Sequence, residues 1–151
     1  MTNSKFSDDK YLRKKQYKDA SNLNARAYLH ENFSTNPSGF IQWEFDQFDF
    51  PPNAIILEIG GGPGYLWRLN TARISTDLQL HFTDLSVGML HTAHEKIQNP
   101  QFTFTALSAN DIPFSANTFD AVIANHMLYH VPNISKTISE IIRVLKSTGK
   151  L

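Results

Sequence analysis

Four residues with a regular spacing could bind a nucleotide-like molecule. Glu58, Gly60, Gly62 and Gly64 follow an apolar run in the order E-x-G-x-G-x-G. Glycines let the backbone of a loop approach a bound molecule closely, because no side chain intervenes. The acid before the glycines would repel a phosphate group, and it would suit a ligand that carries positive charge. The spacing therefore favours a cationic ligand over a phosphorylated one.

Two phosphate-binding patterns compete with this interpretation, and both fit less well. The dinucleotide fingerprint G-x-G-x-x-G needs a third glycine where Tyr65 stands, and the phosphate loop needs a lysine that does not follow these glycines. A nicotinamide-dependent oxidoreductase stays open as an alternative class, because such enzymes use a similar sheet. A glycine-rich turn that only packs a strand against a helix is the structural alternative.

The elements that must position this loop alternate between strands and helices. Residues 54–59 form a short apolar run, which is typical of a strand buried on both faces. Further strands are expected near 78–84, 102–106 and 119–124, and helices over 65–74, 86–97 and 134–145, with Gly149 as the last C-terminal cap. This order predicts an α/β fold with a Rossmann-like, mostly parallel sheet flanked by helices.

An acid at the end of the second predicted strand adds a candidate ligand. Asp84 comes twenty residues after Gly64, and an acid at this place typically accepts hydrogen bonds from ribose hydroxyls. Ser86 follows as a plausible N-cap of the next helix, so capping is an alternative role for Asp84. Ligands of open parallel sheets bind at the carboxyl ends of the strands, and we expect both the loop and Asp84 to lie there.

The glycine loop and the stretch at 107–133 together resemble class I S-adenosylmethionine-dependent methyltransferases, of the small-molecule, type 11-like group. The loop matches the first motif of that family, and an I-P-F triplet at 112–114 and an F-D pair at 119–120 fall at its spacing. The family's usual adenine-binding Asp is replaced here by Ser108. The neighbouring Asn-Asp pair at 110–111 could substitute for it.

The resemblance implies a role for each matching residue. S-adenosylmethionine carries an ammonium, a sulfonium and a carboxylate but no phosphate, which agrees with a glycine loop that follows an acid. The residues implied to hold this cofactor are Glu58, Gly60, Gly62, Gly64, Asp84, Leu85 against the adenine ring, Ser108, Ala109 through its backbone N–H, and Asn125.

The implied reaction is methyl transfer to a small-molecule acceptor. His126 and His130 follow the fourth predicted strand, and they are candidates for a catalytic base because imidazole titrates near neutral pH. Their i, i+4 spacing would also suit a metal pair, but no acid lies between them and we expect no metal site. A purely structural role is the alternative for His130. A cofactor-binding module without activity is the alternative for the chain.

The resemblance also suggests how the chain divides. Residues 1–50 look like a helical extension that folds over the cofactor as a lid, in which Tyr17, Asn24 and Arg26 could reach the ligand. Residues 51–151 correspond to the cofactor-binding core, without the last strands of the family's seven-stranded sheet. We expect the fourth strand to be an unpaired edge, which a second copy or a complementing chain could cover.

Composition excludes several other classes. The chain has 151 residues, no cysteine, and equal numbers of acidic and basic residues. Disulfides and thiolate metal sites are therefore excluded, and neither a nucleic-acid partner nor a membrane partner is expected. The first 30 residues carry seven Lys or Arg against three Asp, a net charge of +4, which we interpret as a solvated helix face. The sequence indicates one cytoplasmic domain.

Overall fold

The computed structural model describes residues 11, 28, 32–35 and 39–151. Five strands in this part of the chain form one parallel sheet in the order β3-β2-β1-β4-β5. The strands are β1 (Ile55–Ile59), β2 (Gln79–Asp84), β3 (Phe102–Ala106), β4 (Phe119–Ile123) and β5 (Leu145–Lys150). The helices are α3 (Phe40–Phe45), α4 (Tyr65–Arg68), α5 (Val87–Ile97) and α6 (Ile134–Val144). Two short 3-10 helices, η3 (Thr71–Arg73) and η4 (Leu128–His130), lie between them. The predicted Rossmann-like α/β fold is confirmed.

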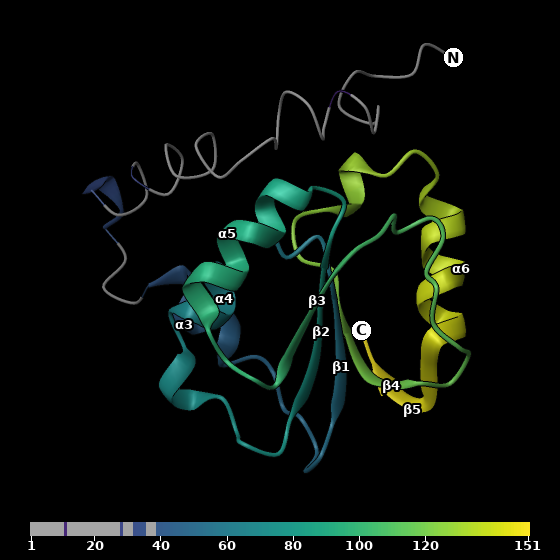
Figure 1. Cartoon of the computed structure of the whole chain (residues 1–151), viewed down its shortest axis with the longest axis horizontal. Coiled ribbons are helices and arrows are strands. Elements are labelled where there is room, and N and C mark those ends of the chain that lie inside the picture. The colour runs from purple at the N-terminus through teal and green to yellow at the C-terminus, as the bar shows by residue number, and fades with distance from the viewer. Residues whose placement is uncertain (1–10, 12–27, 29–31, 36–38) are drawn as a thin grey trace.

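The sheet lies between two layers of helices, with α3, α4 and α5 on one face and α6 on the other (Figure 1). Successive side chains of a strand point to opposite faces, and β1 accordingly serves two cores. Ile56 joins a core with Trp67 and Phe82, whereas Leu57 joins a core with Ile141. The apolar run of β1 is therefore explained by burial on both sides.

Helix α4 is shorter than the predicted helix over 65–74. It ends at Arg68, and the chain then turns through Asn70 into η3. The buried side chain of Asn70 donates from Nδ2 to the Leu66 carbonyl at 2.7 Å and accepts from Arg73 at 3.0 Å. Asparagine side chains compete with the helical backbone for hydrogen bonds in this way, which explains the early end.

The prediction for the C-terminal segment was wrong in three respects. Helix α6 ends at Val144 instead of reaching Leu145, and Gly149 lies in β5 instead of capping a helix. Strand β5 pairs with β4 through an irregular register, so β4 is not the edge of the sheet. Pairing satisfies backbone groups of β4 that would otherwise stay exposed. The edge strand on this side of the described sheet is therefore β5 and not β4.

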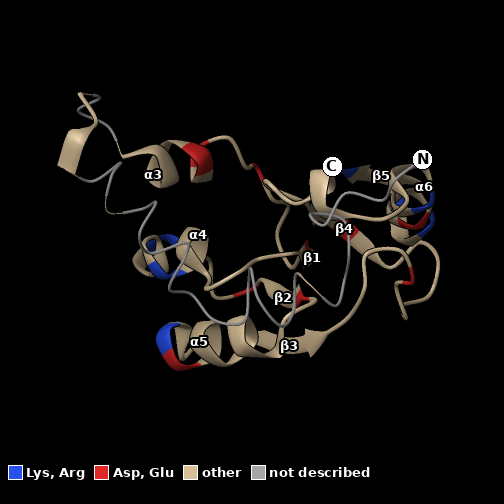
Figure 2. Ribbon diagram, turned by 90° about the horizontal axis from the view of Figure 1, so that it is seen from above, with Lys and Arg blue, Asp and Glu red and all other residues tan. Residues whose placement is uncertain are grey.

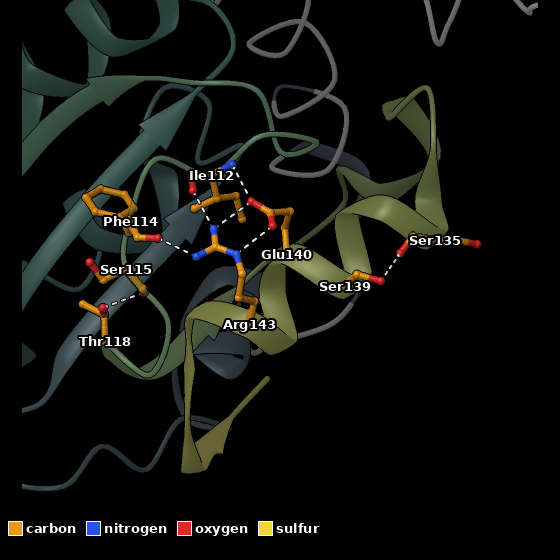
Figure 3. A network of polar contacts seen from close by, with 8 residues as sticks. All are labelled: Ile112, Phe114, Ser115, Thr118, Ser135, Ser139, Glu140 and Arg143. Carbon is orange, nitrogen blue, oxygen red and sulfur yellow. Dashed lines mark hydrogen bonds and ion pairs between the residues drawn. The ribbon is translucent and has the colours of Figure 1, made fainter.

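The loop between β3 and β4 is tied to α6 by a polar network (Figure 3). Arg143 donates to the carbonyl oxygens of Phe114 at 2.7 Å and Ile112 at 2.8 Å, and also to the carboxylate of Glu140. Glu140 in turn accepts the Ile112 backbone N–H at 2.9 Å. The Asp of the F-D pair also has a structural role. Asp120 accepts the backbone N–H of Ile55, the first residue of β1.

We expect Glu140→Gln to weaken this network in a pH-dependent way. The hydrogen bonds from Arg143 and from the Ile112 N–H lower the pKa of Glu140 to about 2. Its stabilising contribution is therefore complete above about pH 4.5 and is lost as the pH falls towards about 2. The variant should melt roughly 2–4 °C lower at pH 6, the shift that about 1 kcal/mol gives at this chain length, and should lose less on acidification. Thermal unfolding against pH measures both effects.

A matched control is Glu95→Gln, because Glu95 is exposed on α5 and belongs to no such network among the described residues. It should leave the acid sensitivity unchanged. Equal acid sensitivity of wild type and Glu140→Gln would contradict the prediction.

The proposed division at residue 50 concerns residues that are mostly outside the described part. Tyr17, Asn24 and Arg26 lie outside the described residues, whereas α3 and the Pro51-Pro52 boundary lie inside them. None of the described helices is both long enough and apolar enough to cross a membrane.

Candidate functional site

A cavity of about 240 Å³ lies at the carboxyl ends of β1 to β4, where the strand order reverses between β1 and β4. This is the place where open parallel sheets bind ligands, and its volume far exceeds the space for one water molecule. The predicted site residues that line it are Glu58, Gly60, Gly62, Asp84, Leu85, Ser108, Ala109, Asn125, His126 and His130. Gly64 does not line it.

The glycine loop has a backbone conformation that residues with side chains rarely adopt. Gly60, Gly62 and Gly64 have φ values of 70°, 58° and 75°, in the left-handed region that favours glycine. Gly64 is the N-cap of α4, and a Cβ there would meet Ile97 of α5 at 2.7 Å. Its observed role is thus close packing between helices, and its predicted role in cofactor binding stays a prediction.

Gly61, which the motif leaves unspecified, has the least room in the loop. A Cβ at this position would lie 2.6 Å from Cε2 of Phe82, closer still to its Cζ, and 2.8 Å from Oε2 of Glu58. Both neighbours are buried, so neither can move aside easily. The sequence held a signal for this position, since a glycine also occupies the variable place of the motif.

Gly61→Ala should therefore be among the most damaging single-methyl additions to the chain. We expect it to cost about 1–3 kcal/mol of unfolding free energy through overpacking, and to displace Glu58 from its place in the cavity. Urea unfolding measures the first effect. Gly39→Ala is the control, because its Cβ would meet only the exposed, flexible end of Gln42; equal losses in the two variants would refute the argument.

Asp84 connects the glycine loop to the start of α5. Its Oδ2 accepts the Gly62 N–H at 2.9 Å and its Oδ1 accepts the Ser86 N–H at 2.7 Å. Burial raises the pKa of Asp84, and these two hydrogen bonds oppose the rise. Ser86 caps α5 as predicted, accepting the Met89 N–H. Asp84 therefore organises the loop, and each carboxylate oxygen keeps a further lone pair for a ligand.

Glu58 is a buried carboxyl group in the cavity wall. Its Oε2 accepts the indole N–H of Trp67 at 2.6 Å, and Trp67 is fully buried. Burial raises the pKa of Glu58 to about 8, the Trp67 hydrogen bond lowers it, and the charges of Glu44 and Asp84 raise it further. At pH 7 the group is mostly protonated, and an approaching cation would favour its ionised form.

The predicted adenine-binding positions follow β2 and its neighbour β3. Leu85, Ser108 and Ala109 line the cavity, whereas Asn110 uses its amide to donate to Asn133 and Thr137 of the α6 end. Neither Asn110 nor Asp111 lines the cavity, so the structure does not support them as substitutes for the missing Asp.

Asn125, His126 and His130 follow β4 and form another wall. The Nδ2 atom of Asn125 is buried and has no hydrogen-bond partner within the described part of the chain. Such orphaned donors are rare, and a bound acceptor atom would satisfy this one. His126 has a φ of 53° and a side chain that is 69% exposed. No cluster of three or more metal-ligating His, Asp or Glu side chains was found among the residues described.

Helix α3 adds residues that the sequence analysis did not assign to the site. Ile41 and Glu44 line the cavity, and Oε1 of Glu44 lies 3.6 Å from Nε2 of His126. Phe45 instead packs edge-on against Trp67. No motif marks Glu44, because its place depends on how α3 packs beside α4 (Figure 1).

The fold and the site define a nucleotide-type cavity with an acidic wall, and comparison with known proteins identifies the family. Residues 57–151 match the methyltransferase domain family. The chain belongs to this family and has the fold of class I S-adenosylmethionine-dependent methyltransferases.

Individual relatives agree with this assignment. Demethylmenaquinone methyltransferase of Symbiobacterium thermophilum is 34% identical over 119 residues, covering 72% of this chain and 47% of the relative. An uncharacterized methyltransferase of Bacillus subtilis is 32% identical over 111 residues, covering 72% of this chain and 60% of the relative. Phosphoethanolamine N-methyltransferase 2 of Haemonchus contortus, solved with S-adenosyl-L-methionine, superimposes with a TM-score of 0.75 at 27% identity, covering 95% of this chain and 34% of that one. The chain thus spans about half the length of the demethylmenaquinone relative.

Proposed function

We propose that this domain binds S-adenosylmethionine in the cavity and transfers its methyl group to a small-molecule acceptor. S-adenosylmethionine is the cofactor of the family to which the chain belongs. The observation that carries the proposal is the convergence of ten predicted site residues on one cavity at the reversal of strand order. The names of the relatives support methyl transfer and small acceptors.

The residues of the cavity fit this cofactor chemically. Backbone N–H groups of the glycine loop and the orphaned Asn125 amide can donate to a carboxylate. Glu58 can balance a cationic centre, and the free lone pairs of Asp84 can accept from ribose hydroxyls. Leu85 and Met89 offer apolar contact to an adenine ring, and Ser108 offers a hydroxyl.

The cofactor supplies a methyl group that is already bound to a good leaving group, so the protein's work is alignment. The walls from β1, β2 and β4 fix the ligand, and α3 covers part of the opening next to His126. His126 and His130 are proposed as bases for an acceptor that must lose a proton. Residues 1–50 are proposed as a lid that includes α3.

Calorimetric titration of the 151-residue chain with S-adenosylmethionine and S-adenosylhomocysteine, with NAD as the control, tests the cofactor assignment. We expect both methionine-derived ligands to bind with 1:1 stoichiometry and NAD not to bind. Binding of NAD alone to the folded chain would instead support the oxidoreductase alternative. Binding without turnover of any acceptor would favour a module without catalytic activity.

A further inference from the structure

The cavity has a carboxylate that the cofactor does not need. Glu58 and Asp84 lie on β1 and β2, beside the glycine loop, whereas Glu44 lies on α3 and faces the segment that follows β4. Its Oε1 atom lies 3.6 Å from Nε2 of His126. Glu44 therefore stands at the side of the cavity where an acceptor would enter.

The ionisable groups that line the cavity favour a cation over an anion, because a cation stabilises their ionised form. Its described lining contains the three carboxyl groups of Glu44, Glu58 and Asp84 but no Lys or Arg. In Figure 2 the basic residues lie on the outer helices and near β5, whereas β1 and β2 carry red positions at the centre. Among the described residues an anionic acceptor would meet this wall without a basic partner, and the carboxyl groups there disfavour an anion relative to a cation.

The carboxylate of Glu44 can also accept hydrogen bonds from a ligand. Its side chain is only 14% exposed, yet its carboxylate accepts no hydrogen bond from the residues described. Burial raises the pKa of Glu44, and His126 lowers it only in part. A partly buried carboxylate whose contact with His126 is as long as 3.6 Å can still accept hydrogen bonds from a ligand with charged N–H groups.

Aromatic rings lie near His126 and in the cavity lining. Phe40 lies 5.8 Å from both Trp43 and His126, and Tyr129 lines the cavity while 61% exposed. Phe40 and Trp43 are about half exposed. Rings beside a carboxylate suit an organic cation, because aromatic faces attract positive charge and also cover apolar groups.

We propose that Glu44 binds the protonated amine of the methyl acceptor, and that the acceptor is an amine with an apolar or aromatic body. This inference rests on the proposed function and names its substrate class. His126, beside Glu44 and open to solvent, receives one proton from the ammonium. The freed nitrogen lone pair then forms a bond to the methyl carbon, while the carbon–sulfur bond breaks and its electron pair stays on sulfur. Charge is conserved, because the product amine becomes cationic.

The test measures amine selectivity in the full chain saturated with S-adenosylhomocysteine. Phenethylamine is compared by calorimetry with 2-phenylethanol, which has the same body without the charge, and with 3-phenylpropanoate, which is anionic. We expect phenethylamine to bind at least tenfold more tightly than either. Glu44→Gln should reduce this preference at least tenfold and leave S-adenosylhomocysteine affinity within twofold. Glu95→Gln is the matched control and should keep the preference.

Each result decides the matter. Equal binding of phenethylamine and 2-phenylethanol to the wild type, or an unchanged preference in folded Glu44→Gln, would overturn the proposal. Preferential binding of 1,4-dihydroxynaphthalene over the amine would also overturn it and indicate a phenolic acceptor. If the folded wild type does not bind S-adenosylhomocysteine, this result would instead contradict the proposed function itself. Thermal unfolding of each variant identifies a folding defect.

Discussion

Asp84→Ala is expected to weaken S-adenosylmethionine binding by roughly 100-fold, the loss that about 2.7 kcal/mol produces. The carboxylate accepts the N–H groups of Gly62 and Ser86, and hydrogen bonds to charged groups contribute about 1.5–3 kcal/mol each. Without Asp84 the loop loses its link to α5, and ribose hydroxyls lose their acceptor. Calorimetry with S-adenosylmethionine measures the change.

Asp84→Asn is the informative companion to this variant. It keeps the size of the side chain and one acceptor oxygen, but its amide turns donors towards one of the two backbone N–H groups. Its affinity should lie between wild type and alanine. Full affinity in either variant would show that Asp84 neither organises the loop nor touches the cofactor, and thermal unfolding distinguishes lost binding from lost structure.

Glu58→Gln should abolish a proton release that accompanies cofactor binding in the wild type. Burial raises the pKa of Glu58 to about 8, so the group holds a proton in the free protein at pH 7. A cationic ligand stabilises the carboxylate and expels this proton. Titrations in buffers of different ionisation enthalpy should show nearly one proton released at pH 7, and none in the variant.

The same shift affects stability, with a definite sign. The unfolded Glu58 has a pKa near 4.5 and the folded group near 8, so the folded protein binds the extra proton between these values. Its contribution is complete below about pH 4.5 and is lost as the pH rises towards 8. Glu58→Gln keeps a carbonyl oxygen for the Trp67 N–H and should flatten the pH profile of urea unfolding. A wild-type profile that rises from pH 5 to 8 while the variant stays flat would contradict this.

The sequence predicted those features that depend on local pattern. The apolar run of β1, the cap at Ser86 and the acid at the end of β2 are local signals, and the structure confirms β1, the cap and the placement of Asp84 beside the glycine loop. The end of α4 was missed because it depends on the hydrogen bonds of the buried Asn70 side chain, and β5 was missed because its formation depends on pairing with β4.

The residues of the site also fall into those that local motifs predict and those that depend on distant contacts. Most of the predicted motif residues line the cavity, whereas the sequence analysis did not find Glu44 or the Trp67 partner of Glu58. Both depend on contacts between elements distant in the chain, and neither has a characteristic spacing. Gly64 shows the reverse case, in which a motif position serves helix packing against Ile97.

The hydrogen bond from Trp67 to Glu58 should make the fluorescence of Trp67 sensitive to the charge of Glu58. Of the two tryptophans in the chain, Trp43 is half exposed, whereas Trp67 is buried with its indole N–H on the cavity carboxyl group. Ionisation of that carboxyl changes the electric field at the indole. In a Trp43→Phe background, fluorescence from Trp67 alone should therefore follow the charge of Glu58 and the arrival of a ligand, in real time and without a label.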